Sequence, residues 1–302
     1  MKNFKYFCEF LIIFILFFIF KIIGYRFASN FGYLIGRTVG PNFRSKEVIL
    51  KNIKNFKQSI KTVLRSFSQV MLQKSAATGL LFCIGIGLNS PTMLLGGITA
   101  ILTSLVTAKL CRYSTEVVHQ GIYGFNAALV GIAVFFFLPV SIISLFLLIF
   151  AAFLSTIISH FMQIKAPNVP TYTAPFVLST WLLLLIIEVL KKETVVTATV
   201  PHLSKNTFGD FYDLFYEVSL MLLRGIAQVM QQDYWLSGLI FITALFVSTY
   251  KAAIWAVIGS AAGILIAQSF SYPESAIFMG NYSFNATLAA IALAKLYHNK
   301  PL

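Results

Sequence analysis

The sequence predicts an all-α polytopic membrane protein that contains two copies of one helical unit. The first observation is composition: 58% of the 302 residues are hydrophobic and only 11% are charged, whereas soluble domains carry roughly 25% charged residues. The second is the presence of segments without charge, such as 127–160 and 174–187 with histidine taken as neutral, as expected of helices that need roughly 20 apolar residues to cross a bilayer. The third is an internal repeat at a constant spacing.

The charged residues are unevenly distributed. Lysine and arginine number 23 against 10 aspartates and glutamates, which gives a formal net charge of +13. The basic residues lie mostly outside the apolar segments, most densely between Arg44 and Arg65. Because the positive-inside rule places such segments in the cytoplasm, we predict a protein of the cytoplasmic (inner) membrane with residues 44–61 inside. Its partner is then the lipid bilayer and not nucleic acid.

The amino-terminal segment resembles a signal sequence, because Lys2 and Lys5 precede an apolar run from Phe10 to Phe20. No small-residue cleavage site of the A-x-A kind follows this run. We therefore expect a retained membrane anchor.

Catalytic and metal-binding patterns are not found. The cysteines Cys8, Cys83 and Cys111 are far apart, and the four histidines lack the spacing of metal ligands. Motifs of serine hydrolases, zinc proteases and phosphate-binding loops do not occur. The sequence therefore predicts a protein that is not an enzyme and that uses no cofactor or metal.

Three motifs recur with one spacing of 159 residues. The pairs are Arg65–Met71 with Arg224–Met230, Gly79–Phe82 with Gly238–Phe241, and Gly121–Leu129 with Gly280–Leu288. The constant spacing indicates a duplicated unit, and duplicated units in transporters place the substrate pathway between the repeats. We predict an anchor and basic segment in 1–60, a first repeat in 61–196, a linker in 197–216 and a second repeat in 217–302. The residues alone leave open whether the repeats are parallel or inverted.

Each repeat carries a glutamine inside an apolar helix, Gln69 in the first and Gln228 in the second. A buried amide without a partner is costly, so both should be paired. Two interpretations remain open. The amides bind a small polar solute at the two mouths of a pore, or they form the interhelical hydrogen bonds that hold membrane bundles together.

The motif Gly-x-Tyr-x-Phe-Asn-Ala-x-Leu predicts a tight turn followed by a helix in each repeat. The turn glycines are Gly121 and Gly280. Asn126 and Asn285 lie near the predicted helix starts, where an asparagine can cap free backbone N–H groups, so we expect a structural role for them. Leu129 and Leu288 lie one turn further on and are expected in the core, with a pore wall as the alternative.

The segment Val169–Phe176 cannot belong to one continuous helix, because Pro170 and Pro175 each remove a backbone donor. The carbonyl groups freed by the break could accept hydrogen bonds from a solute, together with the hydroxyls of Thr171 and Thr173. A simple loop between two spans is the alternative.

These motifs resemble those of the urea transporter family, whose signature is L-P-x-x-T-x-P-F followed by an apolar helix. The signature stands here as Val169–Phe176, with valine in place of the first leucine. The elements G-x-x-G-F-N-x-x-L-V-G at Gly121–Gly131 and R-G-x-x-Q-V at Arg224–Val229 are also similar to that family. The resemblance covers residues 61–296. It implies two inverted repeats with tilted half-helices around a pore, one pore per subunit and a homotrimer.

The resemblance also implies roles for individual residues. The candidate substrate pathway comprises Gln69, Gln228, Thr171, Thr173, Leu129, Leu288 and Tyr282, and the motif residues with structural roles are Pro170, Pro175, Phe176, Asn126, Asn285, Gly121 and Gly280. Thr173 would supply a hydroxyl at the constriction, and Leu129 and Leu288 would narrow slots for a flat solute. The first slot departs from the family, because Leu72 stands where an aromatic residue is expected.

Two features depart from the family. Position 328, which lies 159 residues after Val169, is beyond Leu302, so a second proline–threonine element is missing and the second repeat is expected to be truncated. Residues 28–54 instead resemble the amino-terminal anchor region of lipid A biosynthesis lauroyl acyltransferases, although the H-x-x-x-x-D pair of those enzymes does not occur.

The sequence therefore predicts passive, channel-type transport of urea across the cytoplasmic membrane, impaired by the missing end of the second repeat. The alternatives are a channel for another small neutral solute, such as ammonia or a short amide, or a non-functional fusion with an acyltransferase remnant.

Overall fold

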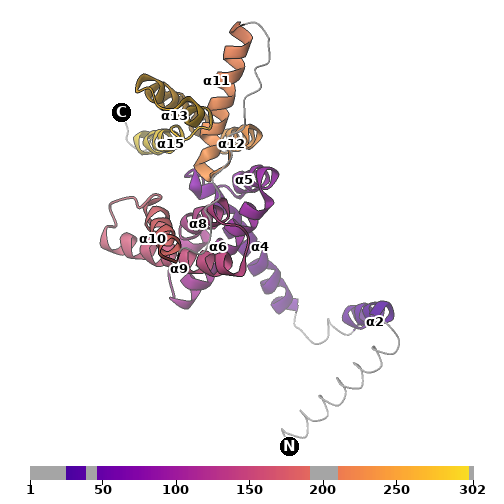
Figure 1. Cartoon of the computed structure of the whole chain (residues 1–302). Coiled ribbons are helices and arrows are strands. Elements are labelled where there is room, and N and C mark those ends of the chain that lie inside the picture. Colours follow the sequence, from indigo (N-terminus) through magenta and orange to yellow (C-terminus); the bar gives the residue numbers. More distant parts are fainter. Residues whose placement is uncertain (1–24, 39–45, 191–209, 299–302) are drawn as a thin grey trace, which may run out of the picture. The chain divides into compact units, whose positions relative to one another are not determined.

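A computed structural model describes residues 25–38, 46–190 and 210–298, and every regular element in these ranges is a helix (Figure 1). The first part of the chain contains α2 (Tyr25–Thr38), α4 (Lys46–Val70), α5 (Ala76–Asn89), α6 (Pro91–Leu110), α7 (Thr115–His119), α8 (Gly124–Phe137), α9 (Ile142–Lys165) and α10 (Ala174–Leu190). The second part contains α11 (Asp210–Ala227), the 3₁₀ turn η1 (Gln228–Met230), α12 (Trp235–Ser248), α13 (Tyr250–Ser269), α14 (Glu274–Phe278) and α15 (Phe284–His298). The predicted fold class, all-α, is confirmed.

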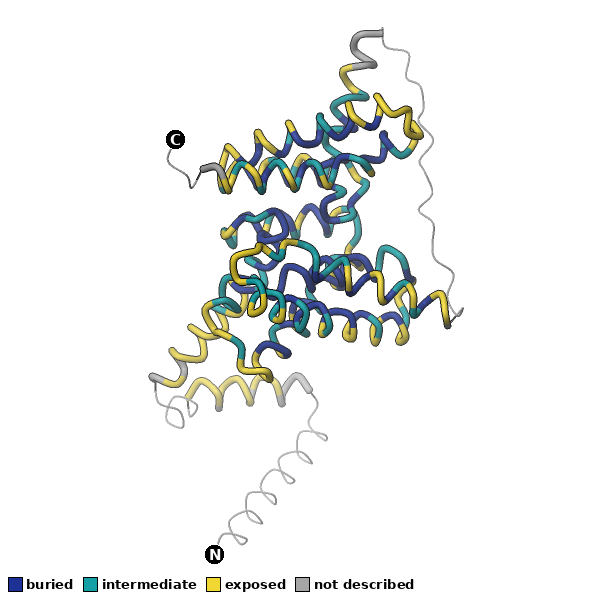
Figure 2. Tube along the Cα trace, turned by 90° about the vertical axis from the view of Figure 1, so that its left-hand side faces the viewer, coloured by how far each residue is buried: buried dark blue, intermediate teal, exposed yellow. Residues whose placement is uncertain are grey.

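The chain divides into two units, residues 1–57 and 58–302. Of the first unit, the structure describes α2 and the beginning of α4, whose described side chains are exposed (Figure 2). The expected anchor in residues 1–24 lies outside the described residues, as does Cys8. The predicted linker also lies mostly outside them, and its last residues, from Asp210, are helical.

The second unit contains two sets of helices in the same order. Shifted by 159 residues, the helices α5, α6, α7 and α8 correspond to α12, α13, α14 and α15. The backbone repeats as well, because residues with positive φ occur in equivalent pairs. These pairs are Leu72 (59°) with Gln231 (56°), Arg112 (56°) with Ser271 (52°), and Gly121 with Gly280 (both 80°). The internal duplication inferred from three motifs is therefore confirmed in three dimensions.

The two repeats contact each other through α5 and α12, and this contact is reciprocal. Thr78 Oγ1 donates a hydrogen bond to the Ala244 carbonyl at 3.3 Å. Its equivalent, Ser237 Oγ, donates to the carbonyl of Gly85, the equivalent of Ala244, at 2.7 Å. A contact in which each half uses the same residues toward the other is the signature of a two-fold axis.

The order of these contacts also fixes the direction of the helices. Along α5 the contacting residues are Thr78, Phe82 and Gly85, and their partners along α12 run backwards, from Ala244 through Phe241 to Ser237. Phe82 and Phe241 are equivalent residues and pack edge to face, with ring centroids 5.0 Å apart. The helices are therefore antiparallel, so the two-fold axis crosses them and the repeats are inverted.

Length and composition identify three of the described helices, α6, α9 and α13, as long and apolar enough to cross a membrane. The helices α5, α8, α10, α12 and α15 are apolar but shorter. The uncharged stretch 127–160 is not one span, because α8 ends at Phe137 and α9 begins at Ile142, after Pro139.

The helices that cover α8 explain its burial. α8 packs on α6, α9 and α10, and all its side chains from Phe125 to Val134 are buried. Its equivalent α15 packs mainly on α13, and much of its surface is half-buried or exposed. All but the first two of the positions 159 residues after α9 and α10 lie beyond the last residue of this sequence.

Candidate functional site

The proline–threonine element separates α9 from α10, so the predicted helix break is confirmed. Pro175 is the second residue of α10, where a proline removes only a donor that has no partner in the helix. Tyr172 has a φ of +40°, a conformation that L-residues rarely adopt. The chain thus turns sharply just before α10 begins.

Asn126 holds this turn from the neighbouring helix. Its Nδ2 donates to the Tyr172 carbonyl at 3.1 Å, and its Oδ1 accepts from the Phe176 N–H at 3.1 Å. These bonds agree with the expected structural role of Asn126, but the helix that it caps is α10 and not its own helix, because it lies inside the first turn of α8. The predicted turn followed by a helix is confirmed, since Gly121 and Gly280 have positive φ and α8 and α15 follow them.

The carbonyl groups of Thr171, Tyr172 and Thr173 are not left free, in contrast to the expectation. The Thr171 carbonyl accepts from the Ala174 N–H at 3.1 Å, and the Thr173 carbonyl accepts from the Val177 N–H at 3.0 Å. The Tyr172 carbonyl accepts from Asn126. Each of these three carbonyls thus already has one protein partner, which leaves at most its second lone pair for a solute.

A cavity of about 430 Å³ lies between this element and α15 of the other repeat. The residues that line it are Val70, Leu72, Phe125, Tyr172, Thr173, Asn285, Leu288, Ala289, Ala292, Leu293 and Leu296. Most are apolar, and the side chains of Tyr172, Thr173 and Asn285 supply the polar groups. An apolar cavity with a few convergent polar groups is the usual form of a small-molecule site.

The cavity brings together some of the predicted pathway residues and not others. Thr173 and Leu288 line it, whereas Leu129, the equivalent of Leu288, is only 2% exposed in the core. Thr171 is half-buried and does not line the cavity. Tyr282 stacks on Tyr272, with ring centroids 4.7 Å apart, and lies in a separate apolar cluster. The two leucines therefore have different surroundings, although their sequence contexts match.

Gln69 and Gln228 make equivalent hydrogen bonds. Gln69 Nε2 donates to the Gln120 carbonyl at 3.1 Å, and Gln228 Nε2 donates to the Met279 carbonyl, also at 3.1 Å. Each glutamine thus ties the end of the repeat's first helix to the turn before α8 or α15. This geometry matches the structural interpretation for the amide nitrogens.

Phe125, Tyr172 and Asn285 are among the cavity residues that were not predicted for the pathway. Phe125 and Tyr172 lie inside the motifs that indicated the site, but their side chains gave no separate signal. Asn285 was expected to be structural, yet it is exposed and lines the cavity. Only the spatial arrangement of α10 distinguishes it from the buried Asn126.

Comparison with known proteins assigns this sequence to a family. The family model for urea transporters matches residues 60–301. Urea transporter 1 of Ovis aries is 29% identical over 256 residues, which cover 80% of this chain and 64% of that protein. Urea transporter 1 of Mus musculus is 27% identical over 251 residues, with 78% and 62% covered. The chain thus spans less than two thirds of the length of these relatives.

The family match begins at residue 60, so the resemblance of residues 28–54 to acyltransferases stays a prediction. In the described part of the chain, no group of three or more His, Cys, Asp or Glu side chains is placed to hold a metal ion. Helices apolar enough to cross a membrane, an inverted duplication and a match over most of the sequence agree with one another. The chain is a multi-pass membrane protein and belongs to the urea transporter family.

Proposed function

We propose that the protein is a passive channel for urea in the cytoplasmic membrane. The family is that of urea transporters, and the relatives carry the name urea transporter. The dense basic segment between Arg44 and Arg65 supports the cytoplasmic membrane as its location.

One observation carries the proposal: the cavity between the proline–threonine element of the first repeat and α15 of the second. Its position agrees with the rule that inverted repeats bind their substrate between them. The apolar side chains, such as Leu288, can contact the faces of a flat molecule. The Thr173 hydroxyl and the Asn285 amide can exchange hydrogen bonds with its polar edge.

We assign Thr173 and Leu288 to the pathway as its polar and apolar sides. Gln69 and Gln228 act on the pathway indirectly, because their amide nitrogens bind the turns from which α8 and α15 start. A homotrimer is part of the proposal, and crosslinking of the purified protein in detergent would give a clean monomer if it is wrong.

The direct test is stopped-flow measurement of urea flux into liposomes that contain the full chain. We expect saturable flux that falls about tenfold in Thr173→Val, because one hydrogen bond lost in the cavity costs about 1.5 kcal/mol. Thr180→Val is the matched control. Thr180 lies on α10, is 6% exposed and does not line the cavity, and its hydroxyl makes no hydrogen bond.

Competition with acetamide, methylurea and ammonia in the same liposomes tests the solute. If acetamide lowers the urea flux as strongly as the same concentration of added urea does, a general amide channel is favoured. Equal flux with and without protein would contradict the proposal.

A further inference from the structure

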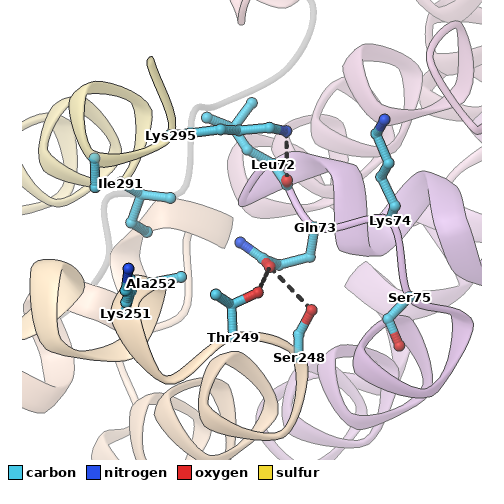
Figure 3. Close-up of a pocket in the computed structure, with 11 residues that line it drawn as sticks. Leu72, Gln73, Lys74, Ser75, Ser248, Thr249, Lys251, Ala252, Ile291 and Lys295 are labelled. Carbon is cyan, nitrogen blue, oxygen red and sulfur yellow. Dashed lines mark hydrogen bonds between the residues drawn. The ribbon is translucent and has the colours of Figure 1, made fainter. Parts of the chain in front are cut away.

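A second cavity, of about 560 Å³, lies where the α4–α5 loop meets the α12–α13 junction and the end of α15 (Figure 3). Three lysines from these three segments line it, Lys74, Lys251 and Lys295. None of the eleven lining residues is a carboxylate. Three positive charges around one cavity repel each other, so an anion in the cavity would be stabilised by all of them.

The polar groups between the lysines are fixed in place. Gln73 is 7% exposed, and its Oε1 accepts hydrogen bonds from Ser248 Oγ at 2.9 Å and Thr249 Oγ1 at 3.4 Å. Lys295 Nζ donates to the Leu72 carbonyl at 2.9 Å (Figure 3). An ammonium group has three donors, so Lys295 keeps two for a ligand while this bond positions it.

The start of α13 adds further donors. Thr249 is the N-cap residue of α13, but its side chain makes no capping bond, because it points to Gln73. The first N–H groups of this 20-residue helix are therefore without a side-chain cap at the edge of the cavity. The amino end of a helix carries a partial positive charge and binds anions.

The equivalent place in the other repeat shows that the fold does not need these charges. There Asp233 stands for Lys74, Thr92 for Lys251 and Phe136 for Lys295. Asn89 Nδ2 donates to both Gln232 Oε1 and Asp233 Oδ1 at 3.0 Å.

The start of α6 in the first repeat also offers fewer free donors than the start of α13 in the second. α6 begins with Pro91, which has no N–H, and Ser90 caps it by accepting from the Met93 N–H at 3.3 Å. At the start of α6 one donor is thus absent and another is capped, and an acidic residue is accommodated nearby. At the start of α13 the helix N–H groups have no side-chain cap, and the three lysines surround the cavity beside them.

We propose that the Lys74–Lys251–Lys295 cavity binds a phosphate-type anion. Its two sources are the headgroup of an anionic phospholipid and a free inorganic phosphate. A phosphate offers several acceptor oxygens, which can accept hydrogen bonds from the ammonium groups and from the first N–H groups of α13, those of Tyr250 and Lys251. The site is distinct from the urea pathway, since the two cavities share only Leu72.

The test uses the full chain purified in a neutral detergent. Binding is measured by native mass spectrometry and by the shift in melting temperature. One arm adds inorganic phosphate, a second adds phosphatidylglycerol, and a third adds phosphatidylcholine. The variant Lys74→Gln/Lys251→Gln/Lys295→Gln removes the charges and keeps most of the length of the three exposed side chains.

We expect phosphatidylglycerol to bind in preference to phosphatidylcholine, and the triple variant to bind it on the order of a hundredfold more weakly, since each lysine near a headgroup contributes about 1 kcal/mol. The matched control is Lys61→Gln/Lys109→Gln/Lys165→Gln. It removes the same charge from exposed lysines outside the cavity and should bind like the unmodified protein.

The outcomes separate the sources. Stabilisation by inorganic phosphate that the triple variant abolishes assigns the site to the phosphate group itself, and an effect of the lipid alone assigns it to a membrane headgroup. If neither ligand binds, or if the triple variant and the control lose binding equally, the proposal is wrong. Since binding is measured without urea, this result is independent of the transport test.

Discussion

Asn126 and Asn285 occupy equivalent positions in the two repeats but have opposite surroundings. Asn126 is fully buried and joins two backbone groups of the segment that starts α10. Asn285 is exposed and faces the cavity of the proposed pathway. The same residue in the same motif is thus a structural tie in one repeat and an available polar group in the other.

We therefore expect Asn126→Ala to destabilise the protein by about 2–3 kcal/mol, because the Phe176 N–H loses its partner and the Tyr172 carbonyl loses a donor. Asn285→Ala should leave stability within about 0.5 kcal/mol. Thermal unfolding in detergent measures both. Equal losses in the two variants would contradict the difference in their roles.

Gly79 and Gly238 are equivalent residues, and each allows the preceding helix, α4 or α11, to approach closely. A Cβ atom on Gly79 would overlap the Leu64 carbonyl oxygen, and one on Gly238 would overlap the Leu223 carbonyl oxygen. Because these are backbone atoms that cannot rotate away, we expect each glycine→alanine change to cost at least about 3 kcal/mol, the upper end for overpacking.

Gly87→Ala is the control on α5, since its Cβ would meet only the flexible end of Leu94, at 3.1 Å. Its stability should stay within about 1 kcal/mol of the unmodified protein. Retained expression and melting temperature in Gly79→Ala would show that α4 and α5 are not in this close contact.

Gln69→Leu and Gln228→Leu should have matching effects. Each change removes one hydrogen bond to a turn carbonyl, so we expect each to lower stability by about 1 kcal/mol and the double variant by about twice that amount. Urea flux measured on the same samples then shows whether transport falls with stability. Flux lost at unchanged melting temperature would favour direct contact of the amides with the solute.

Leu288→Trp should block the pathway by filling its cavity. The larger side chain occupies volume that a solute would need, and half-burial at this position lets the protein tolerate it. We expect urea flux at the level of protein-free liposomes. Leu239→Trp on the exposed side of α12 is the control and should conduct normally. Flux preserved in Leu288→Trp would place the pathway elsewhere.

The fold class and the duplication were predictable from sequence because both depend on local patterns. Composition indicates a membrane protein, and a constant spacing between the Gln69 and Gln228 motifs indicates a repeat even where identity is low. The helix break at Pro170 and Pro175 was predictable for the same reason, since proline acts on its own backbone.

The site was less predictable because it depends on contacts between distant segments. The sequence places Asn126 near a helix start but cannot show that it caps α10, whose partner atoms are 46 and 50 residues away. It likewise assigns Leu129 and Leu288 the same role, whereas Leu129 is buried in the core and Leu288 lines a cavity. The direction of the repeats needed the antiparallel contact of α5 with α12.

The reciprocal contact between α5 and α12 has a consequence for the origin of the chain. Every bond across it, from Thr78 to Ala244 and from Ser237 to Gly85, could be made equally by two identical short polypeptides inserted in opposite directions. The axis between Phe82 and Phe241 would then have been the symmetry axis of an ancestral homodimer whose gene later fused with its own copy. Once the copies were joined, selection could act on each separately, which allowed three lysines around a cavity in one place and an aspartate at the equivalent place of the other repeat.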